Sequence, residues 1–346
     1  MTACGYLDDI VSLGWSVGLW ETATTICRSA LKLSDEVCDL SSSRFSGVLA
    51  PVITPFRKDL SPDGRRLVTH CKWLLNQGVS LAVFGTNSEA NSLSLEEKIT
   101  LLDQLLDAGV DPAFLMPGTG SCALSDAVTL TAHAVKLGCA GTLMLPPFFY
   151  KGVADAGLYA YYSEIIERVG SAALRIYLYH IPPFSQVPLS LNLIDKLVHA
   201  YPNTIAGLKD SSGDWDDTQA FLSGGWSDFR VFCGSESFLL QTMRHGGAGC
   251  ISATANVNPA AIKGLYDNWK ESDAEAAQQQ LNKIRNIFQS FAMIPALKAA
   301  TAHYSSDPEW FTVRPPIVEL DPDSLSRLQQ QLSATEFEMP GLPNDA

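Results

Sequence analysis

The sequence lacks an excess of positive charge and any long apolar run. Its 346 residues carry 24 lysines and arginines against 37 aspartates and glutamates, a formal net charge of −13. A surface of this sign repels nucleic acid and anionic membrane lipid, so neither is expected as a partner, although a local pocket can still bind a small anion. No run of about 18 apolar residues occurs, so no transmembrane helix is expected.

Clustered metal ligands and paired cysteines are also missing. The eight cysteines are scattered and form no CxxC pair. The first ten residues include Asp8 and Asp9 and have no basic stretch, which argues against a signal peptide. We therefore expect a cytoplasmic protein with reduced thiols. No HxH, HExxH or clustered His/Cys/Asp pattern is present, so no metal site is expected.

From Gly47 onward, short apolar runs alternate with amphipathic helical patterns. The runs predicted as strands are 48–53, 81–84, 114–117, 141–145, 174–179, 204–208, 229–232 and 249–252. The stretches predicted as helices include 95–108, 123–137, 156–169, 191–201 and 238–245. This alternation predicts a parallel sheet, because parallel strands require helical crossovers.

The predicted strand ends follow one another at nearly regular intervals of 20 to 34 residues. Near-regular units favour a (β/α)8 TIM barrel over an open doubly wound sheet. After Trp269 the pattern becomes purely helical. We therefore predict a partly helical N-terminal extension at 1–45, a catalytic (β/α)8 barrel at 46–270, and C-terminal helices and a tail at 271–346.

Two residues with useful chemistry are placed at strand ends, Lys209 in "TIAGLKDSSGDW" and Tyr179 in "IYLYHIPP". They are 209 − 179 = 30 residues apart, which is one β/α unit. Adjacent strands lie about 4.8 Å apart, so the amine and the phenol can converge on one bound atom at the catalytic face of a barrel. Burial disfavours the charged form of an amine, and a neutral amine can attack a carbonyl to form a Schiff base. The phenol can relay protons.

A polar turn follows the second predicted strand, in "VFGTNSEANSLSLEEK" at 83–98. After Gly85, the residues Thr86, Asn87 and Ser88 offer hydroxyl, amide and backbone N–H groups. Such a turn suits a carboxylate. A 2-oxo acid bound there would present its C2 carbonyl to Lys209.

Taken singly, each of these features has a simpler interpretation. A lysine at a strand end is usually a solvated charge, here with Asp210 as a candidate partner. Tyr179 alone is typical of a core tyrosine with a satisfied hydroxyl. The turn alone can simply precede a helix, since Ser94 and Glu97 form a plausible capping box. The three features together, at the strand ends of one barrel, favour a site.

The motifs also carry a family resemblance. They are "GVLAPVITPF" at 47–56, "FGTNSEA" at 84–90, "LPPFFYK" at 145–151, "YHIP" at 179–182, "GLKDSSGD" at 207–214, "FCGSESFLL" at 232–240 and "GCISATANVNP" at 249–259. In their order and spacing, residues from about 47 to 330 resemble the dihydrodipicolinate synthase / N-acetylneuraminate lyase family of class I pyruvate-dependent aldolases.

The resemblance implies a (β/α)8 barrel with C-terminal helices, a homo-oligomer (tetramer or dimer), and no cofactor beyond a covalent Schiff base. It implies that Lys209 forms this Schiff base with pyruvate or another 2-oxo acid and that Tyr179 relays protons. Thr86 and Asn87 match the pair that binds the substrate carboxylate, and Thr86 also joins the relay. Ile251 matches a position that lines the pocket.

Some positions depart from the family pattern. The branch that condenses pyruvate with aspartate semialdehyde has an arginine five residues after the relay tyrosine, which binds a second carboxylate; this chain has Phe184 there. A second relay tyrosine, contributed by a neighbouring subunit, falls at Phe149, and Tyr150 is the next residue able to replace it. "GTN" and "KDSSGD" look more like the 4-hydroxy-2-oxoglutarate and 2-keto-3-deoxy sugar acid aldolase branches, in which Ser211 would contact the substrate.

The expected function is therefore a lyase that cleaves or forms a carbon–carbon bond between pyruvate and an aldehyde. Its substrate would be a 4-hydroxy-2-oxo acid or a 2-keto-3-deoxy sugar acid. Two chemical alternatives stay open: a 4-hydroxy-tetrahydrodipicolinate synthase and a 2-oxo acid dehydratase that uses the same iminium. A non-enzymatic 2-oxo acid sensor is the third alternative, which the presence of Lys209 and Tyr179 disfavours.

Overall fold

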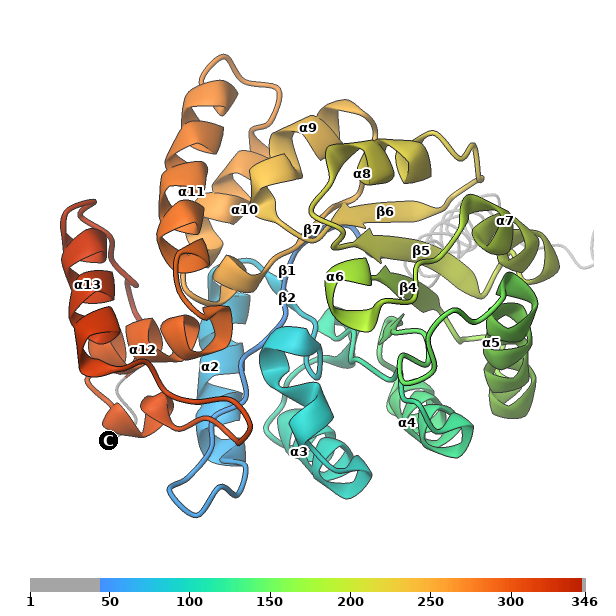
Figure 1. The fold of residues 1–346 in the computed structure, drawn as a ribbon, viewed down its shortest axis with the longest axis horizontal. Helices are drawn as coiled ribbons and strands as arrows, with labels where there is room; N and C mark the ends of the chain where they lie inside the picture. The colour runs from blue at the N-terminus through green and yellow to red at the C-terminus, as the bar shows by residue number, and fades with distance from the viewer. Residues whose placement is uncertain (1–43, 344–346) are drawn as a thin grey trace, which may run out of the picture. The chain divides into compact units, whose positions relative to one another are not determined.

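A parallel sheet of seven strands organises residues 44–343, the part of the chain that this computed structural model describes. In hydrogen-bonding order the strands are β2 (Ser80–Leu81), β1 (Gly47–Ala50), β7 (Gly249–Ile251), β6 (Arg230–Cys233), β5 (Ile205–Asp210), β4 (Ile176–His180) and β3 (Thr142–Met144). Helices surround the curved sheet (Figure 1). The predicted parallel sheet is thus confirmed. The extension predicted at 1–45 lies outside the described residues, except for its last two positions.

The strand predicted at 114–117 is wrong. Leu115 makes a single bridge to Leu81 of β2, and Gly118, the residue after the segment, makes a single bridge to Leu143 of β3. Pro117 has no N–H to donate, so a regular ladder cannot run through it. Its backbone still contacts both edges of the sheet. Met116 N donates to Leu81 O at 2.8 Å. On the other side, Leu143 N donates to Pro117 O at 2.9 Å.

The ends of the other strands also differ from the prediction, and the strand predicted at 81–84 is shortened to Ser80–Leu81. β1 stops at Ala50, before Pro51, which has no N–H to continue the ladder. β5 continues beyond the apolar run to include Lys209 and Asp210. Lys209 therefore lies within the strand, where ladder hydrogen bonds fix its backbone.

The helices predicted between the strands are confirmed, with ends that differ by about one residue. They are α3 (Leu95–Asp107), α4 (Leu124–Lys136), α5 (Asp155–Val169), α7 (Leu191–Ala200) and α9 (Leu239–Arg244). The sheet is also accompanied by α2 (Gly64–Asn76), α6 (Pro182–Ser185), α8 (Trp215–Leu222) and α10 (Pro259–Asp267). The capping box of α3 is present: Glu97 N donates to Ser94 Oγ at 3.1 Å, and Ser94 N donates to Glu97 Oε2 at 2.9 Å.

The C-terminal helical region is confirmed as well. It consists of α11 (Ala274–Gln289), α12 (Met293–Ser305) and α13 (Pro322–Ser333). Figure 1 draws these helices in orange and red, at one side of the sheet near α2 and α10. Short 3-10 turns occupy several loops: η1 (Thr86–Ser88), η2 (Ala90–Ser92), η3 (Pro112–Phe114), η4 (Glu236–Phe238), η5 (Ala253–Asn256) and η6 (Pro308–Phe311).

The core has two layers because side chains alternate between the two faces of each strand. One face packs beneath the surrounding helices. The other forms an inner cluster of buried residues that includes Leu49, Met116, Tyr179, Phe232 and Ile251. Met116 comes from the segment between β2 and β3, so that segment contributes to the inner cluster even without a regular strand.

Tyr177 fills the inner layer and explains two glycines. Its ring is fully buried in β4. A Cβ added at Gly141 would lie 2.6 Å from the ring, and one added at Gly207 would lie 2.9 Å from it. The Gly207 Cβ would also lie 2.2 Å from Arg230 O in β6. The glycine just before "LKD" therefore lets the tyrosine pack closely against β5.

We expect Gly207→Ala to destabilise the fold by about 1–3 kcal/mol, because the added methyl group overpacks the inner layer. Gly157→Ala in α5 is the matched control. Its Cβ would meet nothing within 4 Å, so the substitution should be neutral or slightly stabilising. Urea unfolding of both variants measures the difference, and equal stabilities would contradict the packing argument.

Candidate active site

Lys209 and Tyr179 meet side by side in the sheet. β4 and β5 pair in parallel with Tyr179 opposite Lys209, as the spacing of one β/α unit predicts. Lys209 Nζ lies 3.3 Å from the Tyr179 hydroxyl and 4.4 Å from the centroid of its ring. Lys209 is only 3% exposed and Tyr179 2%. The amine therefore lies in a nearly dry environment with a phenol as its hydrogen-bonding neighbour.

The polar turn after β2 reaches the same point. Thr86 Oγ1 lies 3.1 Å from the Tyr179 hydroxyl, so the tyrosine links the turn to the lysine. The turn is stabilised by a hydrogen bond between two of its own residues and by one from Thr54. Gly85 N donates to Ser88 Oγ at 3.1 Å, and Thr54 Oγ1 donates to Ser88 O at 2.7 Å. Thr86 and its neighbour Asn87 stay half-buried, which leaves their polar groups accessible to a small ligand.

Ser211 and Ile251 flank this group. Ser211 follows β5, and its N–H donates to His180 O at 2.7 Å. A Cβ at Gly234 would lie 2.1 Å from Ser211 Oγ, so this glycine makes room for the hydroxyl. Ile251 ends β7, is fully buried and belongs to the same inner cluster as Tyr179. Both residues thus lie on strands or turns of the same sheet as the lysine.

The aromatic residues expected to contact substrate are in a different environment. Phe149, Tyr150 and Phe184 are 72%, 73% and 73% exposed. The first two rings pack edge to face with centroids 5.4 Å apart. Lys151 Nζ donates to Ser185 O at 2.8 Å, which ties their loop to α6, the helix that carries Phe184. The structure places these rings on a loop and on the helix α6 connected to it, but does not bury them with the lysine.

Asp210 is not the partner of the lysine. Side chains alternate along a strand, so Asp210 points to the opposite face of β5. Its carboxylate accepts hydrogen bonds from Ser212 N at 3.0 Å and from the hydroxyls of Ser212 and Thr218. Burial raises the pKa of Asp210 and lowers the pKa of His180, its neighbour on β4. The simple interpretation of Lys209 as a surface charge paired with Asp210 is therefore wrong.

The sequence analysis missed one buried ion pair near the turn, between Glu89 and Lys298 of α12. The side chains of both residues are completely buried. The available signal was the charge of Lys298 in the otherwise apolar helical pattern "IPALKAA". A lysine is rarely buried without a partner, but the sequence did not identify that partner.

No group of three or more His, Cys, Asp or Glu side chains within 44–343 is arranged to hold a metal ion. In the same part of the chain, no helix is long and apolar enough to cross a membrane.

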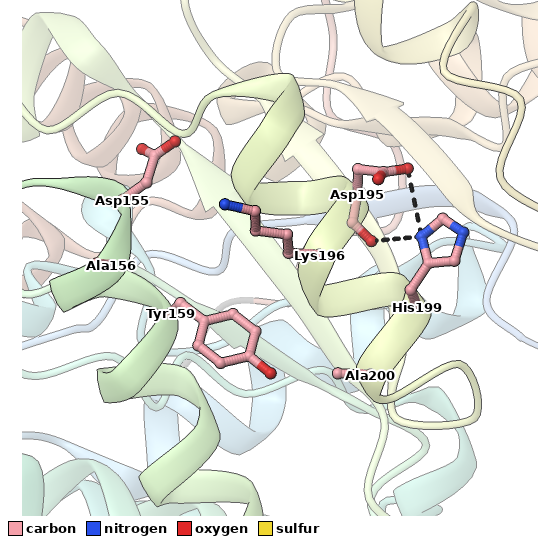
Figure 2. Close-up of a pocket in the computed structure, with 7 residues that line it drawn as sticks. All are labelled: Asp155, Ala156, Tyr159, Asp195, Lys196, His199 and Ala200. Atoms are coloured by element: carbon pink, nitrogen blue, oxygen red, sulfur yellow. Dashed lines mark hydrogen bonds and ion pairs between the residues drawn. The ribbon is translucent and has the colours of Figure 1, made fainter.

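A hollow of about 660 Å³ lies between α5 and α7 (Figure 2). Its lining is Asp155, Ala156, Tyr159, Asp195, Lys196, His199 and Ala200. Most of these residues are exposed, and several already have partners. Asp155 accepts a hydrogen bond from Ser190 Oγ at 2.6 Å, and His199 lies 3.3 Å from Asp195 in its own helix. None of the predicted site residues lines this hollow, so the lysine and tyrosine form the better candidate.

Comparison with known proteins places the chain in a family. Residues 44–335 match the model of the dihydrodipicolinate synthetase family. The chain belongs to this family. Its members are carbon–carbon lyases, and this protein is therefore a carbon–carbon lyase of the dihydrodipicolinate synthetase family.

Individual relatives agree with this assignment. A 4-hydroxy-tetrahydrodipicolinate synthase from Thermus thermophilus is 32% identical over 293 residues, which cover 83% of this chain and 95% of that protein. An "uncharacterized DapA-like lyase" from Chloroflexus aurantiacus is 31% identical over 286 residues, 82% of this chain and 94% of that protein. The structure of YagE, a family member from E. coli K12 in complex with pyruvate, matches with a TM-score of 0.78 at 25% identity and covers 85% of this chain and 100% of that one.

Proposed function

We propose that this lyase is a Schiff-base-forming aldolase in which Lys209 is the nucleophile. The observation that carries the proposal is the chain of contacts from Lys209 Nζ to the Tyr179 hydroxyl at 3.3 Å and on to Thr86 Oγ1 at 3.1 Å. A buried amine beside two hydroxyl groups has the composition that imine chemistry requires: a nucleophile and a proton relay. The lysine itself is the covalent catalyst, so the reaction needs no cofactor.

The reaction runs in the cleavage direction as follows. Lys209 Nζ adds to C2 of the 2-oxo acid, and the resulting carbinolamine loses water to give an iminium. Tyr179 donates its proton to the hydroxyl group that leaves as this water, so its phenolate can then accept the proton of the C4 hydroxyl. The C3–C4 bond breaks, the aldehyde leaves, and the electron pair moves into the iminium to give an enamine. Protonation at C3 and hydrolysis release pyruvate and free Lys209.

The turn at Thr86 and Asn87 would bind the carboxylate of the substrate. Its hydroxyl, amide and backbone N–H groups are suitable donors for an anion. The complex of YagE with pyruvate shows that a related protein of this family binds a 2-oxo acid. In this proposal residues 115–118, which bridge β2 and β3 without forming a regular strand, take the place of the eighth strand and close a (β/α)8 barrel around the inner cluster.

The proposed substrate class rests on the residues that flank the lysine and on the exposed ring of Phe184. Ser211 would orient the C4 hydroxyl of a 4-hydroxy-2-oxo acid, and Ile251 would form the apolar wall of the pocket. Phe184 offers an apolar ring where a guanidinium would be needed to bind a second carboxylate. We therefore favour a substrate with an uncharged distal part, such as a 2-keto-3-deoxy sugar acid.

A second candidate function is the synthase reaction, which joins pyruvate to aspartate semialdehyde. The relative from Thermus thermophilus, named as such a synthase, favours it. The aldehyde substrate of that reaction carries a carboxylate, and Phe184 supplies no charge to bind it. The aldolase therefore remains the first choice.

The aromatic loop is consistent with a homo-oligomer. Phe149 and Tyr150 are adjacent large rings that are 72% and 73% exposed. Exposed apolar groups of this size favour coverage by a second surface. In a homo-oligomer that surface would belong to another copy of the chain, and Tyr150 would then be available to the proton relay.

Trapping with borohydride tests the nucleophile. Incubation with pyruvate and sodium borohydride should add the mass of pyruvic acid less one oxygen atom to the peptide that contains Lys209, because reduction fixes the imine after water has left. Lys209→Ala should abolish both the adduct and turnover. Lys196→Ala, which removes an exposed lysine of α7, should retain both. Mass spectrometry of the digested protein measures the adduct, and its absence from wild-type Lys209 would exclude the mechanism.

Removal of one hydroxyl group tests the proton relay. Tyr179→Phe should lower kcat about 10²–10⁴-fold, because the proton relay is lost while the ring remains packed. Thr86→Val should also lower kcat, and Thr86→Ser should restore it in part. Tyr177→Phe is the matched control two residues earlier on the same strand. Its hydroxyl accepts a hydrogen bond from Phe45 N at 2.7 Å, so its loss should leave kcat nearly unchanged. Equal kcat values for the two tyrosine variants in a pyruvate-release assay would disprove the relay.

A charge introduced at position 184 tests substrate choice. Phe184→Arg should raise kcat/KM for substrates with a second carboxylate, such as 4-hydroxy-2-oxoglutarate, by roughly tenfold relative to uncharged sugar acids. Phe184→Leu is the control and should preserve the wild-type preference. A wild-type enzyme that already prefers substrates with a second carboxylate would contradict the preference for an uncharged distal part, and efficient condensation of pyruvate with aspartate semialdehyde would favour the synthase.

A further inference from the structure

Glu89 ends the polar turn after β2 in a strained conformation. This turn, residues 85–89, is called the carboxylate-binding turn below. Its φ of 54° lies in the left-handed region, and Phe84, just before the turn, also has a positive φ of 62°. Residues other than glycine adopt this region at a cost in free energy and persist there only where their surroundings hold them. The turn is therefore strained on both sides and requires contacts that fix it.

The backbone of Glu89 is directly connected to the residues that would bind the substrate. Glu89 N donates to Thr86 O at 3.1 Å, and the next residue closes the turn again through a bond from Ala90 N to Gly85 O at 3.3 Å. A change in the conformation of Glu89 would therefore move Thr86. Thr86 is the residue whose hydroxyl lies 3.1 Å from the Tyr179 hydroxyl.

The side chain of Glu89 is held by the C-terminal region. Lys298 Nζ of α12, 209 positions away in the sequence, donates to Glu89 Oε1. Arg314 N donates to the other carboxylate oxygen, Oε2, at 2.9 Å. Lys298 Nζ makes a second bond to Thr312 O at 2.8 Å. Both oxygens of the carboxylate are thus occupied, and neither points toward the substrate-binding side as a free acceptor.

Other side chains enclose the ion pair of Glu89 and Lys298. Lys298 Nζ and the guanidinium carbon of Arg314 lie 4.5 and 4.7 Å from the centroid of the Phe56 ring. The Arg314 side chain is itself bound to Glu97 at 2.6 and 2.8 Å. Burial lowers the pKa of Lys298 to about 8, and Glu89 opposes that shift. In a site this dry, loss of one charge leaves the other without a partner, which is strongly unfavourable.

We propose that Glu89 and Lys298 are positioning residues for the carboxylate-binding turn, which they fix through Glu89 so that Thr86 and Asn87 are ready to receive the substrate carboxylate. This inference rests on the proposed function of the turn. Neither residue touches the substrate; each acts through the backbone of the turn. α12 would then stabilise the binding site in addition to packing on the sheet.

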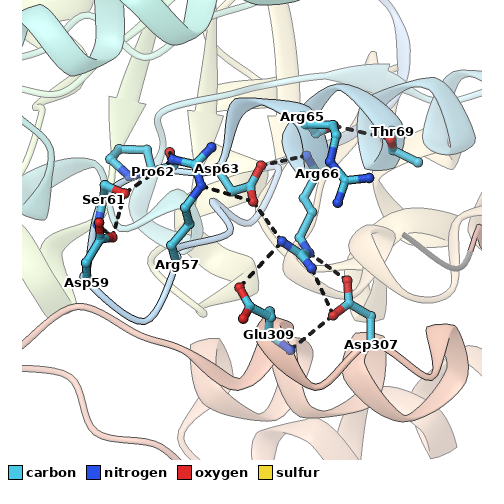
Figure 3. Close-up of polar contacts among 10 residues, drawn as sticks. All are labelled: Arg57, Asp59, Ser61, Pro62, Asp63, Arg65, Arg66, Thr69, Asp307 and Glu309. Carbon is cyan, nitrogen blue, oxygen red and sulfur yellow. Dashed lines mark hydrogen bonds and ion pairs between the residues drawn. The ribbon is translucent and has the colours of Figure 1, made fainter. Parts of the chain in front are cut away.

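A second buried ion pair offers a matched control for stability (Figure 3). Arg66 Nε of α2 lies 2.6 Å from Asp307 Oδ2, and its Nη1 lies 2.7 Å from Asp63 Oδ2. The Arg66 side chain is 9% exposed and that of Asp307 is 1% exposed. This pair also joins an early helix to the C-terminal region, but none of its contacts reaches residues 85–89. Arg66→Met should therefore reduce stability without changing the turn.

The test compares Lys298→Met, Glu89→Gln, the double variant and Arg66→Met at a temperature at which all are folded by circular dichroism. The first readout is the pyruvate concentration that gives half-maximal borohydride trapping of Lys209. The second is hydrogen exchange of the turn amides. We expect both single variants to require at least tenfold more pyruvate and to exchange faster at 85–90. Arg66→Met should match the wild type in both readouts.

The double variant, Lys298→Met with Glu89→Gln, distinguishes a loss of stability from a loss of positioning of the turn. Removal of both charges should recover much of the stability lost in either single variant, because no unpaired charge remains. The raised pyruvate requirement should persist, because the contact with Lys298 that helps to hold position 89 in its left-handed conformation is then lost. The inference would be overturned if folded Lys298→Met and Glu89→Gln had the pyruvate requirement and the exchange rates of the wild type. It would also be overturned if Arg66→Met changed both readouts by the same amount as these variants. Absence of any adduct in the wild type would instead reject the proposed function, and hydrogen exchange would then decide alone whether the pair orders the turn.

Discussion

The pairing of β4 with β5, with Tyr179 opposite Lys209, is the constraint on which the candidate site depends. A shift of one residue in either strand would turn one of the two side chains to the opposite face. The alternation of faces also turns Asp210 toward the helix-covered face, where Ser212 of its own turn and Thr218 of α8 donate hydrogen bonds to it. The amine therefore keeps a phenol rather than a carboxylate as its neighbour, inside an acidic protein whose net charge is −13.

Other parts of the structure pack around Lys209 and Tyr179 and bring a further polar group to them. Gly207 and Gly141 let Tyr177 pack tightly below the site, which keeps the inner layer dry. The turn after β2 brings Thr86 to the tyrosine, and the C-terminal helices reach back to that turn through the buried pair of Glu89 and Lys298. The strands of the sheet, the turn and the C-terminal helices thus converge on one small group of polar atoms, which fits the proposed chemistry of a carbon–carbon lyase.

Much of this arrangement could be predicted from the sequence, because it depends on local periodicity. The spacing of one β/α unit was sufficient to place Lys209 beside Tyr179, and the turn at Thr86 was identifiable from its residues. The strand expected at 114–117 was wrong because Pro117 interrupts its ladder, which an apolar pattern alone does not register. The exposure of Phe149 and Phe184 depends on loop paths that periodicity does not describe. The pair of Glu89 and Lys298 joins positions 209 residues apart, so only the folded structure reveals it.

A crystal structure of the protein soaked with pyruvate would test the central claim most directly. The account predicts continuous density from Lys209 Nζ to C2 of the ligand, with the ligand carboxylate at Thr86 and Asn87 and the Tyr179 hydroxyl within hydrogen-bonding distance. Pyruvate bound without a covalent link to Lys209, or bound only elsewhere, such as the hollow between α5 and α7, would contradict it.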